Sequence, residues 1–279
     1  MALSRLNLHA GRWFAFFGAG FLIVPSAIIL FIYFGSNQDI PNYDDGNYTN
    51  RFDPNWLRKL WEFRRNEFSY MLAIDFFACM GLIFSLYSIL CLKKILMFAP
   101  SFTKNVVVYS YLVGSLLPAL EFLQNMGGLT EAYNISVEVK EDSALQALEV
   151  AYRVSEARSI WVFSLIYLFI SLSIVTASFL FWTYQEFESK THAVLGLFVG
   201  FIGIATLIVE VSWWFVDGLR MAFGLMTLFW GVVLVPGWLI FLGWRIGRFV
   251  SKGGHHRSRT GDDMTSSIGD IEMESNISI

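Results

Sequence analysis

Six long runs of apolar residues, separated by shorter polar segments, dominate the chain. They cover residues 13–34, 70–92, 105–123, 160–182, 193–216 and 221–244. Each run is close to the roughly 20 residues that a helix needs to cross a bilayer. The runs are apolar on all sides, whereas the strands of a membrane barrel would alternate over about ten residues. The pattern therefore predicts an all-α polytopic membrane protein, a six-transmembrane-helix bundle with two short non-cytosolic loop regions.

The composition supports this fold class and sets the outline of the chain. Of the 279 residues, 55% are hydrophobic and 15% charged, whereas soluble domains carry about 25% charged residues. We expect a cytosolic N-terminus (1–12), a membrane domain (13–244) and a C-terminal tail (245–279) whose polar, charged composition predicts disorder. Arg5 and Arg12 precede the first run, as in a signal peptide. The run is longer than the usual apolar region of about 7–15 residues, which favours a retained span.

The orientation of the chain in the membrane is predicted from its N-glycosylation sequons and its basic residues. With the N-terminus in the cytosol, Lys and Arg are only slightly more numerous on the cytosolic side. Two N-glycosylation sequons, at Asn47 and Asn134, then fall together on the non-cytosolic side, and a third, at Asn276, falls on the other side. The start of the tail is basic next to the last run, which suits anionic lipid of the cytosolic leaflet; its residues are Arg245, Arg248, Lys252, Arg257 and Arg259. We predict that both termini are cytosolic, in the plasma membrane or a secretory-pathway membrane.

The two outer loop regions carry amphipathic patterns. Residues 56–65 alternate aromatic and basic side chains, which indicates either a helix lying in the membrane interface or an outward extension of the second span. In residues 124–158, the stretch 135–139 alternates like a β-strand. Ser143 and Gln146 there predict a capping box that starts an amphipathic helix running into the fourth span. We expect the two regions to form a modest outer cap.

Three acidic residues lie inside the predicted spans. Asp75, Glu121 and Glu210 fall at a similar depth near the outer face, with Arg158, Asp217 and Arg220 slightly further out as charge partners. Charges in lipid are costly, so such residues mark an ion or proton site by default. The alternative is a structural belt of ion pairs near the interface.

Small residues and a cysteine add two further predictions. Gly196, Gly200 and Gly203 are spaced along one face of the fifth span, where another helix, from the same chain or a second copy, can approach closely. Cys91 lies at the cytosolic end of the second span beside Lys93 and Lys94. It is either a palmitoylation site or a small buried apolar residue.

The sequence lacks several catalytic and cofactor-binding motifs, and this limits the functions that it allows. None of the four histidines lies within the predicted spans, and no nucleophile elbow, Walker motif or dinucleotide motif is present. We therefore expect no enzyme activity, no metal, no cofactor and no nucleic-acid partner. Two functions remain. One is a non-catalytic integral membrane protein that associates with lipids, a membrane protein partner or its own copies. The other is a channel or secondary transporter with an outer cation or proton site at Asp75, Glu121 and Glu210.

Overall fold

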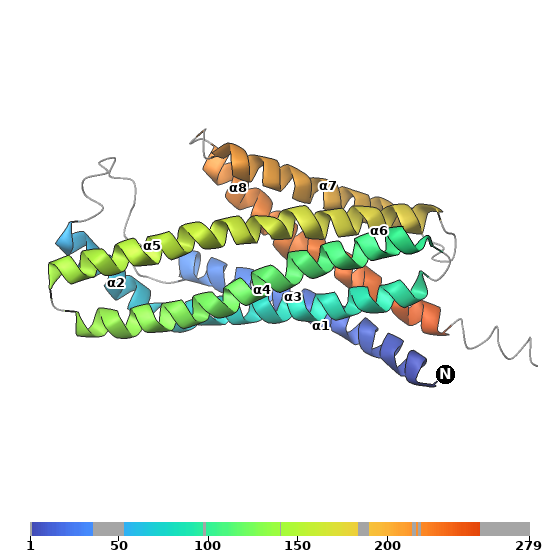
Figure 1. The fold of residues 1–279 in the computed structure, drawn as a ribbon, viewed down its shortest axis with the longest axis horizontal. Coiled ribbons are helices and arrows are strands. Elements are labelled where there is room, and N and C mark those ends of the chain that lie inside the picture. Colours follow the sequence, from blue (N-terminus) through green and yellow to red (C-terminus); the bar gives the residue numbers. More distant parts are fainter. Residues whose placement is uncertain are drawn as a thin grey trace, which may run out of the picture.

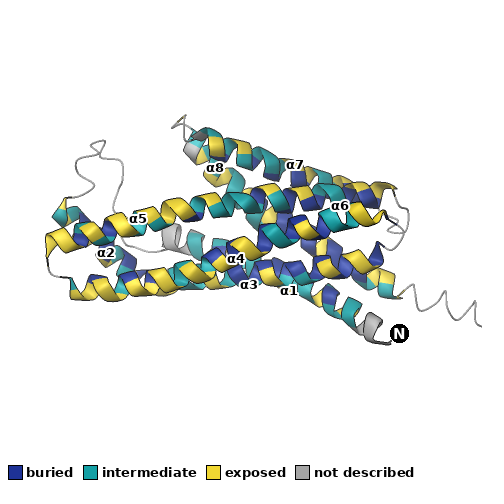
Figure 2. Ribbon diagram, viewed as in Figure 1, coloured by how far each residue is buried: buried dark blue, intermediate teal, exposed yellow. Residues whose placement is uncertain are grey.

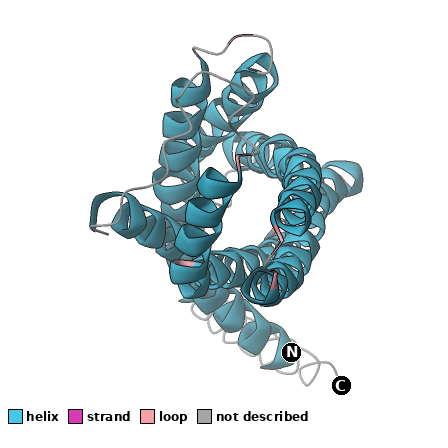
Figure 3. Ribbon diagram, turned by 90° about the vertical axis from the view of Figure 1, so that its left-hand side faces the viewer, coloured by secondary structure: helices cyan, strands magenta, loops and turns pink. Residues whose placement is uncertain are grey.

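The chain runs back and forth as a series of long helices, joined by short connections where these are described (Figures 1 and 3). The structure, a computed structural model, describes residues 2–35, 53–96, 99–139, 141–183, 190–213, 216 and 219–251, and these contain no β-strand. The elements are α1 (Ala2–Gly35), α2 (Pro54–Asn66), α3 (Phe68–Ile95), α4 (Ser101–Glu138), α5 (Asp142–Leu165), the π-helical η2 (Ile166–Ile170), α6 (Ser171–Thr183), α7 (Lys190–Trp213), α8 (Leu219–Leu228) and the π-helical η4 (Phe229–Leu234). Residues 235–251 continue η4 as α-helix.

Within these residues, six helices are long and apolar enough to cross a membrane, which confirms the predicted bundle. They are packed as a ring: α1 against α3, α3 against α4, α4 against α6, and α6 against α7. The last helix closes the ring, because Gly243 and Gly247 lie against Arg12 of α1. Large side chains fill the centre, among them Tyr111, Ile174 and Trp238, which are fully buried. The N-terminal end of α1 and the end of the last helix lie at the same end of the bundle (Figure 1).

Two of the helices are much longer than a bilayer is thick. Helix α4 has 38 residues, and α5, η2 and α6 form a continuous helix of 42. At 1.5 Å per residue these measure about 57 and 63 Å, against roughly 30 Å of hydrocarbon. The outer parts of α4 and α5 therefore run on beyond α7 and α8, and α2 packs beside α5 (Figure 1). Much of this outer part of α5 is exposed (Figure 2). We call α2 and the outer parts of α4 and α5 the outer cap.

The structure of the outer cap differs from three sequence predictions. Residues 135–138, predicted as β-like, are the end of α4. Helix α4 passes straight through Gly127 and Gly128, because tertiary contacts such as the stacking of Phe68 on Tyr133, 4.4 Å between ring centroids, outweigh the low helix propensity of glycine. The N-cap of α5 is Glu141, without a side-chain capping bond, so the capping box at Ser143 is wrong.

The third correction concerns residues 56–65. They form α2, a separate helix that ends at Asn66 before α3 begins at Phe68, and its apolar face packs against the protein. Leu57 and Trp61 are buried with Ala132 of α4 and Leu145 of α5 in a small second core. Packing of α2 on the protruding helices removes this apolar area from water more completely than the interface would.

Helix α7 packs against α6 through its glycine face. A Cβ added at Gly203 would overlap Ser171 Oγ of α6 and lie 2.6 Å from Trp230 Nε1. Gly200 meets Val175 and the Ser171 carbonyl of α6, and Gly196 meets Ser178 of α6 and Trp238. The glycines therefore serve contacts within the chain, mainly to the fourth span and also to the sixth.

We predict that Gly203→Ala lowers the free energy of unfolding by about 1–3 kcal/mol, the usual cost of overpacking. Trp230 cannot move aside without losing the hydrogen bond from its Nε1 to the Val199 carbonyl, 2.9 Å. The matched control is Gly127→Ala, in open space inside α4, which should stabilise the helix by roughly 0.5–1 kcal/mol. Thermal unfolding in detergent measures both, and an unchanged Gly203→Ala variant would contradict the close contact.

Candidate functional site: a cavity at the base of the outer cap

A cavity of about 640 Å³ lies between α3, α4 and α5, where the outer cap meets the membrane bundle. This volume is typical of sites for small molecules, which span about 300–1,000 Å³. Its apolar lining comes from Met71, Ile74, Leu129, Leu148, Ile160 and Phe163, among others. Its polar lining comes from Asp75, Asn125, Glu131, Tyr152, Ser155, Glu156 and Ser159.

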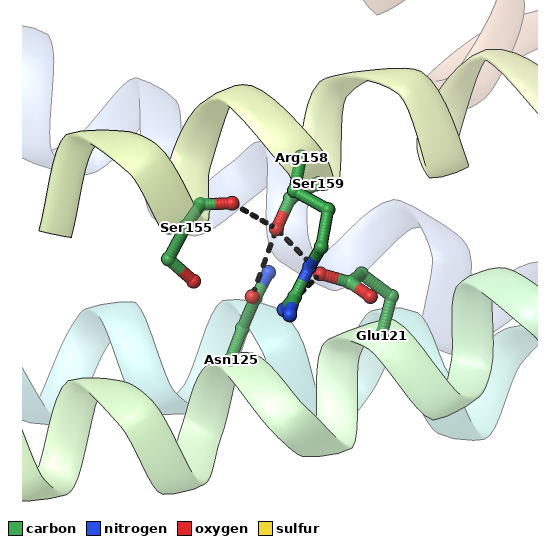
Figure 4. A network of polar contacts seen from close by, with 5 residues as sticks. All are labelled: Glu121, Asn125, Ser155, Arg158 and Ser159. Carbon is green, nitrogen blue, oxygen red and sulfur yellow. Dashed lines mark hydrogen bonds and ion pairs between the residues drawn. The ribbon is translucent and has the colours of Figure 1, made fainter. Parts of the chain in front are cut away.

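One wall of the cavity is a hydrogen-bonded network between α4 and α5 (Figure 4). Arg158 Nη2 donates to Glu121 Oε1 at 2.9 Å, and Ser159 Oγ donates to the same oxygen at 2.6 Å. Ser159 Oγ also lies 3.0 Å from Asn125 Oδ1 and from the Ser155 carbonyl. Glu121 is buried while Arg158 is half exposed. The network therefore gives Glu121 a cation and a hydroxyl partner and ties α4 to α5 at this level.

The other acids of the cavity have different surroundings. Asp75 of α3 is partly buried, and among the described residues it has no hydrogen bond or ion pair. Glu131 of α4 and Glu156 of α5 also line the cavity but are exposed. Asp75 is thus a carboxylate inside the cavity, and the two glutamates mark its solvent-facing side.

A buried charge network holds the outer cap together beside the cavity. Arg64 Nη1 of α2 donates to Glu149 Oε2 of α5 at 2.5 Å, and Arg153 Nε donates to Glu149 Oε1 at 2.7 Å. The Arg64 guanidinium also lies over two rings, 4.8 Å from the centroid of Trp61 and 4.2 Å from that of Tyr152. Because Tyr152 lines the cavity, this network fixes one side of the cavity wall.

The sequence-predicted acids do not all meet at the cavity. Asp75 lines it, and Glu121 reaches it only through its partners Asn125 and Ser159. Glu210 is buried elsewhere, on α7, with Ser164 of α5 and Tyr167 of η2 as polar neighbours.

Of the predicted charge partners, only Arg158 has a described side chain. Arg158 pairs with Glu121. Asp217 is outside the described residues, and Arg220 is the second residue of α8 but its side chain is not described.

The remaining predicted sites lie away from the cavity. Asn134 is exposed on outer α4, whereas Asn47 is outside the described residues. Cys91 is buried, and its Sγ donates to the Asn7 carbonyl of α1 at 3.3 Å, which favours the buried apolar interpretation.

Of the basic residues predicted to hold anionic lipid, two are described. Arg245 and Arg248 lie over Trp244, with Cζ 5.1 and 4.1 Å from the ring centroid. Lys252, Arg257 and Arg259 fall outside the described residues.

The buried ion pair of the cap was missed by the sequence analysis. Arg64 and Glu149 are 85 positions apart, so no local pattern joins them. One signal was available, since Glu149 lies on the same face of α5 as Leu145 and Tyr152 at helical spacing. A third missed residue is His192, which is fully buried at the start of α7 and stacks on Phe181, 5.0 Å between ring centroids.

No protein-family model matches the sequence, and no curated protein or solved structure is significantly similar to it.

We predict that Arg64→Met destabilises the outer cap by about 3–5 kcal/mol, because Glu149 keeps a buried charge without its main partner. Hydrogen exchange of the α2 amides should accelerate, while exchange in the buried middle of α3 and α6 stays slow. The control is Arg58→Met on the same helix, whose ion pair with Asp142 is exposed and contributes about 0–1 kcal/mol. Equal exchange in the two variants would show that the Arg64 pair does not hold the cap.

Proposed function

We propose that this chain is a non-catalytic integral membrane protein of the secretory route or plasma membrane, which acts by associating with a protein partner through its outer cap. The observation that carries the proposal is an apolar stripe on the exposed side of α5. Val150, Val154 and Trp161 are 48%, 65% and 59% exposed. Their spacing of four and then seven residues puts them on one face of the helix, together with exposed Ala157.

The position of this stripe favours a protein over lipid. If the fourth span occupies about residues 160–182, Val150 and Val154 lie roughly 9–15 Å above its start, at 1.5 Å per residue. Lipid chains do not reach this height, so water or a partner must cover Val150 and Val154. The cap that presents the stripe is fixed by the buried Arg64–Glu149 pair, and a rigid surface loses less entropy on binding.

The non-catalytic and secretory parts of the proposal rest on the sequence. Motifs for phosphate, dinucleotide and nucleophile chemistry are missing from it. The sequons at Asn47 and Asn134 support an outer cap that faces the lumen or the cell exterior.

Site-specific photocrosslinking tests the association. With p-benzoylphenylalanine at position 154 in the full-length chain in cells, we expect a discrete adduct of higher mass, because a seated partner presents C–H bonds to the probe. The adduct should disappear when Val150→Glu is added, which places a charge in the apolar interface.

The probe at position 58 is the control, since Arg58 is exposed on α2 away from the stripe. An adduct pattern at position 154 no different from that at position 58 would contradict a partner on the stripe. Lipid adducts alone at position 154 would place the stripe in the bilayer and contradict it as well.

A second candidate function, ion or proton transport, is favoured by Glu210. Its side chain is 3% exposed, and Oε2 is buried with no hydrogen-bond partner among the described residues. Tyr167 of the nearby π-helical η2 donates to Thr227 Oγ1 at 3.0 Å, and its ring lies 5.2 Å from that of Trp230 in π-helical η4. π-helical segments occur frequently at functional sites, and an intramembrane acid is a functional candidate.

If the chain transports cations or protons, Glu210→Gln should abolish flux into proteoliposomes while leaving the thermal unfolding midpoint nearly unchanged, because the amide keeps the shape of the side chain but cannot bind a cation. Flux of protons and of K⁺ through the wild-type protein is the reference, and Asp142→Asn, an exposed acid of the cap, is the control variant. Equal flux in wild type and Glu210→Gln would remove Glu210 from any transport role.

A further inference from the structure

We propose that the cavity at the base of the outer cap binds an organic ammonium ion with an apolar body, and that Asp75 is its counter-ion. This inference goes beyond the proposed function, because it concerns a small ligand and a surface of α5 different from the apolar stripe. It rests on the charge, the lining and the shape of the cavity.

Asp75 is a cavity carboxylate with no cationic partner among the described residues. Two arginines beside the cavity already have acidic partners, Arg64 in Glu149 and Arg158 in Glu121. Among the described residues Asp75 has neither an ion pair nor a hydrogen bond, although it is partly buried. An ionised carboxylate removed from water without a partner is unfavourable, and a cationic ligand in the cavity would supply that partner.

The rest of the lining suits an organic ion better than a metal ion. Within the described residues, no group of three His, Cys, Asp or Glu side chains is close enough together to hold a metal. The carboxylates of Asp75, Glu131 and Glu156 come from three different helices and share the cavity with apolar side chains such as Ile74, Leu148 and Phe163. A volume of about 640 Å³ holds far more than an ammonium group, so the ligand has an apolar part that these side chains cover.

The exposed acids set the sign of the ligand charge. Glu131 and Glu156 add negative charge on the solvent-facing side of the cavity. A concave site lined by one sign of charge concentrates ions of the opposite sign and repels anions. Cations are therefore drawn to the cavity first by the two glutamates and then held at Asp75.

Fluorescence titration of the full-length protein in phosphatidylcholine nanodiscs tests the proposal. The probe is dansylcadaverine, a primary ammonium on a flexible chain with an aromatic body, whose emission rises when it leaves water. We expect a saturable component that empty nanodiscs lack. N-acetyl dansylcadaverine has the same body without the charge, and it should bind roughly 10- to 100-fold more weakly, the usual range for loss of a charge-assisted hydrogen bond.

Variants assign the binding to Asp75. Asp75→Asn should weaken dansylcadaverine binding by roughly the same 10- to 100-fold, and Asp75→Glu should retain most of it because the charge is kept. Glu156→Gln should weaken binding less, since this acid is exposed and screened by salt. Asp142→Asn removes one negative charge from the same cap outside the cavity and should bind like wild type. Thermal unfolding confirms that each variant is folded. If Asp75→Asn does not fold, the single variants Asp75→Glu and Glu156→Gln still test the proposal, because the first should retain most of the binding and the second should weaken it.

Three results would overturn the proposal: equal binding of the acetylated probe, unchanged affinity in folded Asp75→Asn, or no saturable binding above empty nanodiscs. None of these results changes the crosslinking expected at position 154, so failure of this inference is distinguishable from failure of the proposed function. The source of the ammonium is tested by adding phosphatidylethanolamine to the nanodiscs. Competition with the probe assigns the site to a lipid headgroup, and the absence of competition assigns it to a soluble amine; either result supports ammonium recognition.

Discussion

The ion pair between Arg64 and Glu149 is the interaction on which the outer half of the molecule depends. Both side chains are almost completely removed from water, 8% and 0% exposed, and Glu149 uses its second oxygen to hold Arg153. A buried pair of this kind adds little net stability when complete, but an unpartnered charge in its place is strongly unfavourable. Its consequence is geometrical. It ties α2 to α5 at one angle, with Trp61 and Tyr152 packed around the guanidinium.

The inner half of the molecule is held together differently. Helices in lipid gain little from burying apolar surface against each other, so close approach and local hydrogen bonds matter more. Glycines of α7 let α6 approach its backbone, and buried serines such as Ser178 donate to a carbonyl four residues back on their own helix. Ser173 is an exception that links helices, since its Oγ donates to the Val107 carbonyl of α4 at 2.7 Å. The result is a packed centre in which tyrosine and tryptophan side chains fill the space between helices.

The cavity lies where these two kinds of packing meet. Towards the inner end of the bundle, α4 packs against both α3 and α6, while in the outer cap α2 packs on α4 and α5. The Glu121 network closes one wall, and Asp75 is left facing the space between the helices. A largely apolar space with a carboxylate that has no ion pair among the described residues is a place where a ligand gains from both charge and apolar contact. The packed centre does not offer this combination.

The sequence alone determined the parts of this protein that depend on composition and on the spacing of apolar residues along the chain. The lengths of the six apolar runs, set by the thickness of the bilayer, predict six spans, and the amphipathic pattern of residues 56–65 and 143–152 predicts helices outside them. The sequence also marks Asp75, Glu121 and Glu210 as unusual, because charge in a span is rare whatever the fold.

Tertiary structure decided which side chains meet. Arg64 finds Glu149, and Arg158 finds Glu121, across separations of 85 and 37 positions, which no local pattern encodes. Contacts between helices also keep α4 helical at Gly127 and Gly128, despite the low helix propensity of glycine. They also bury Leu57 and Trp61 of α2 against the protein. Glu210 was separated from the cavity for the same reason: depth in the membrane follows from position in a span, but the direction of a side chain around its helix is fixed only when neighbouring helices pack against it.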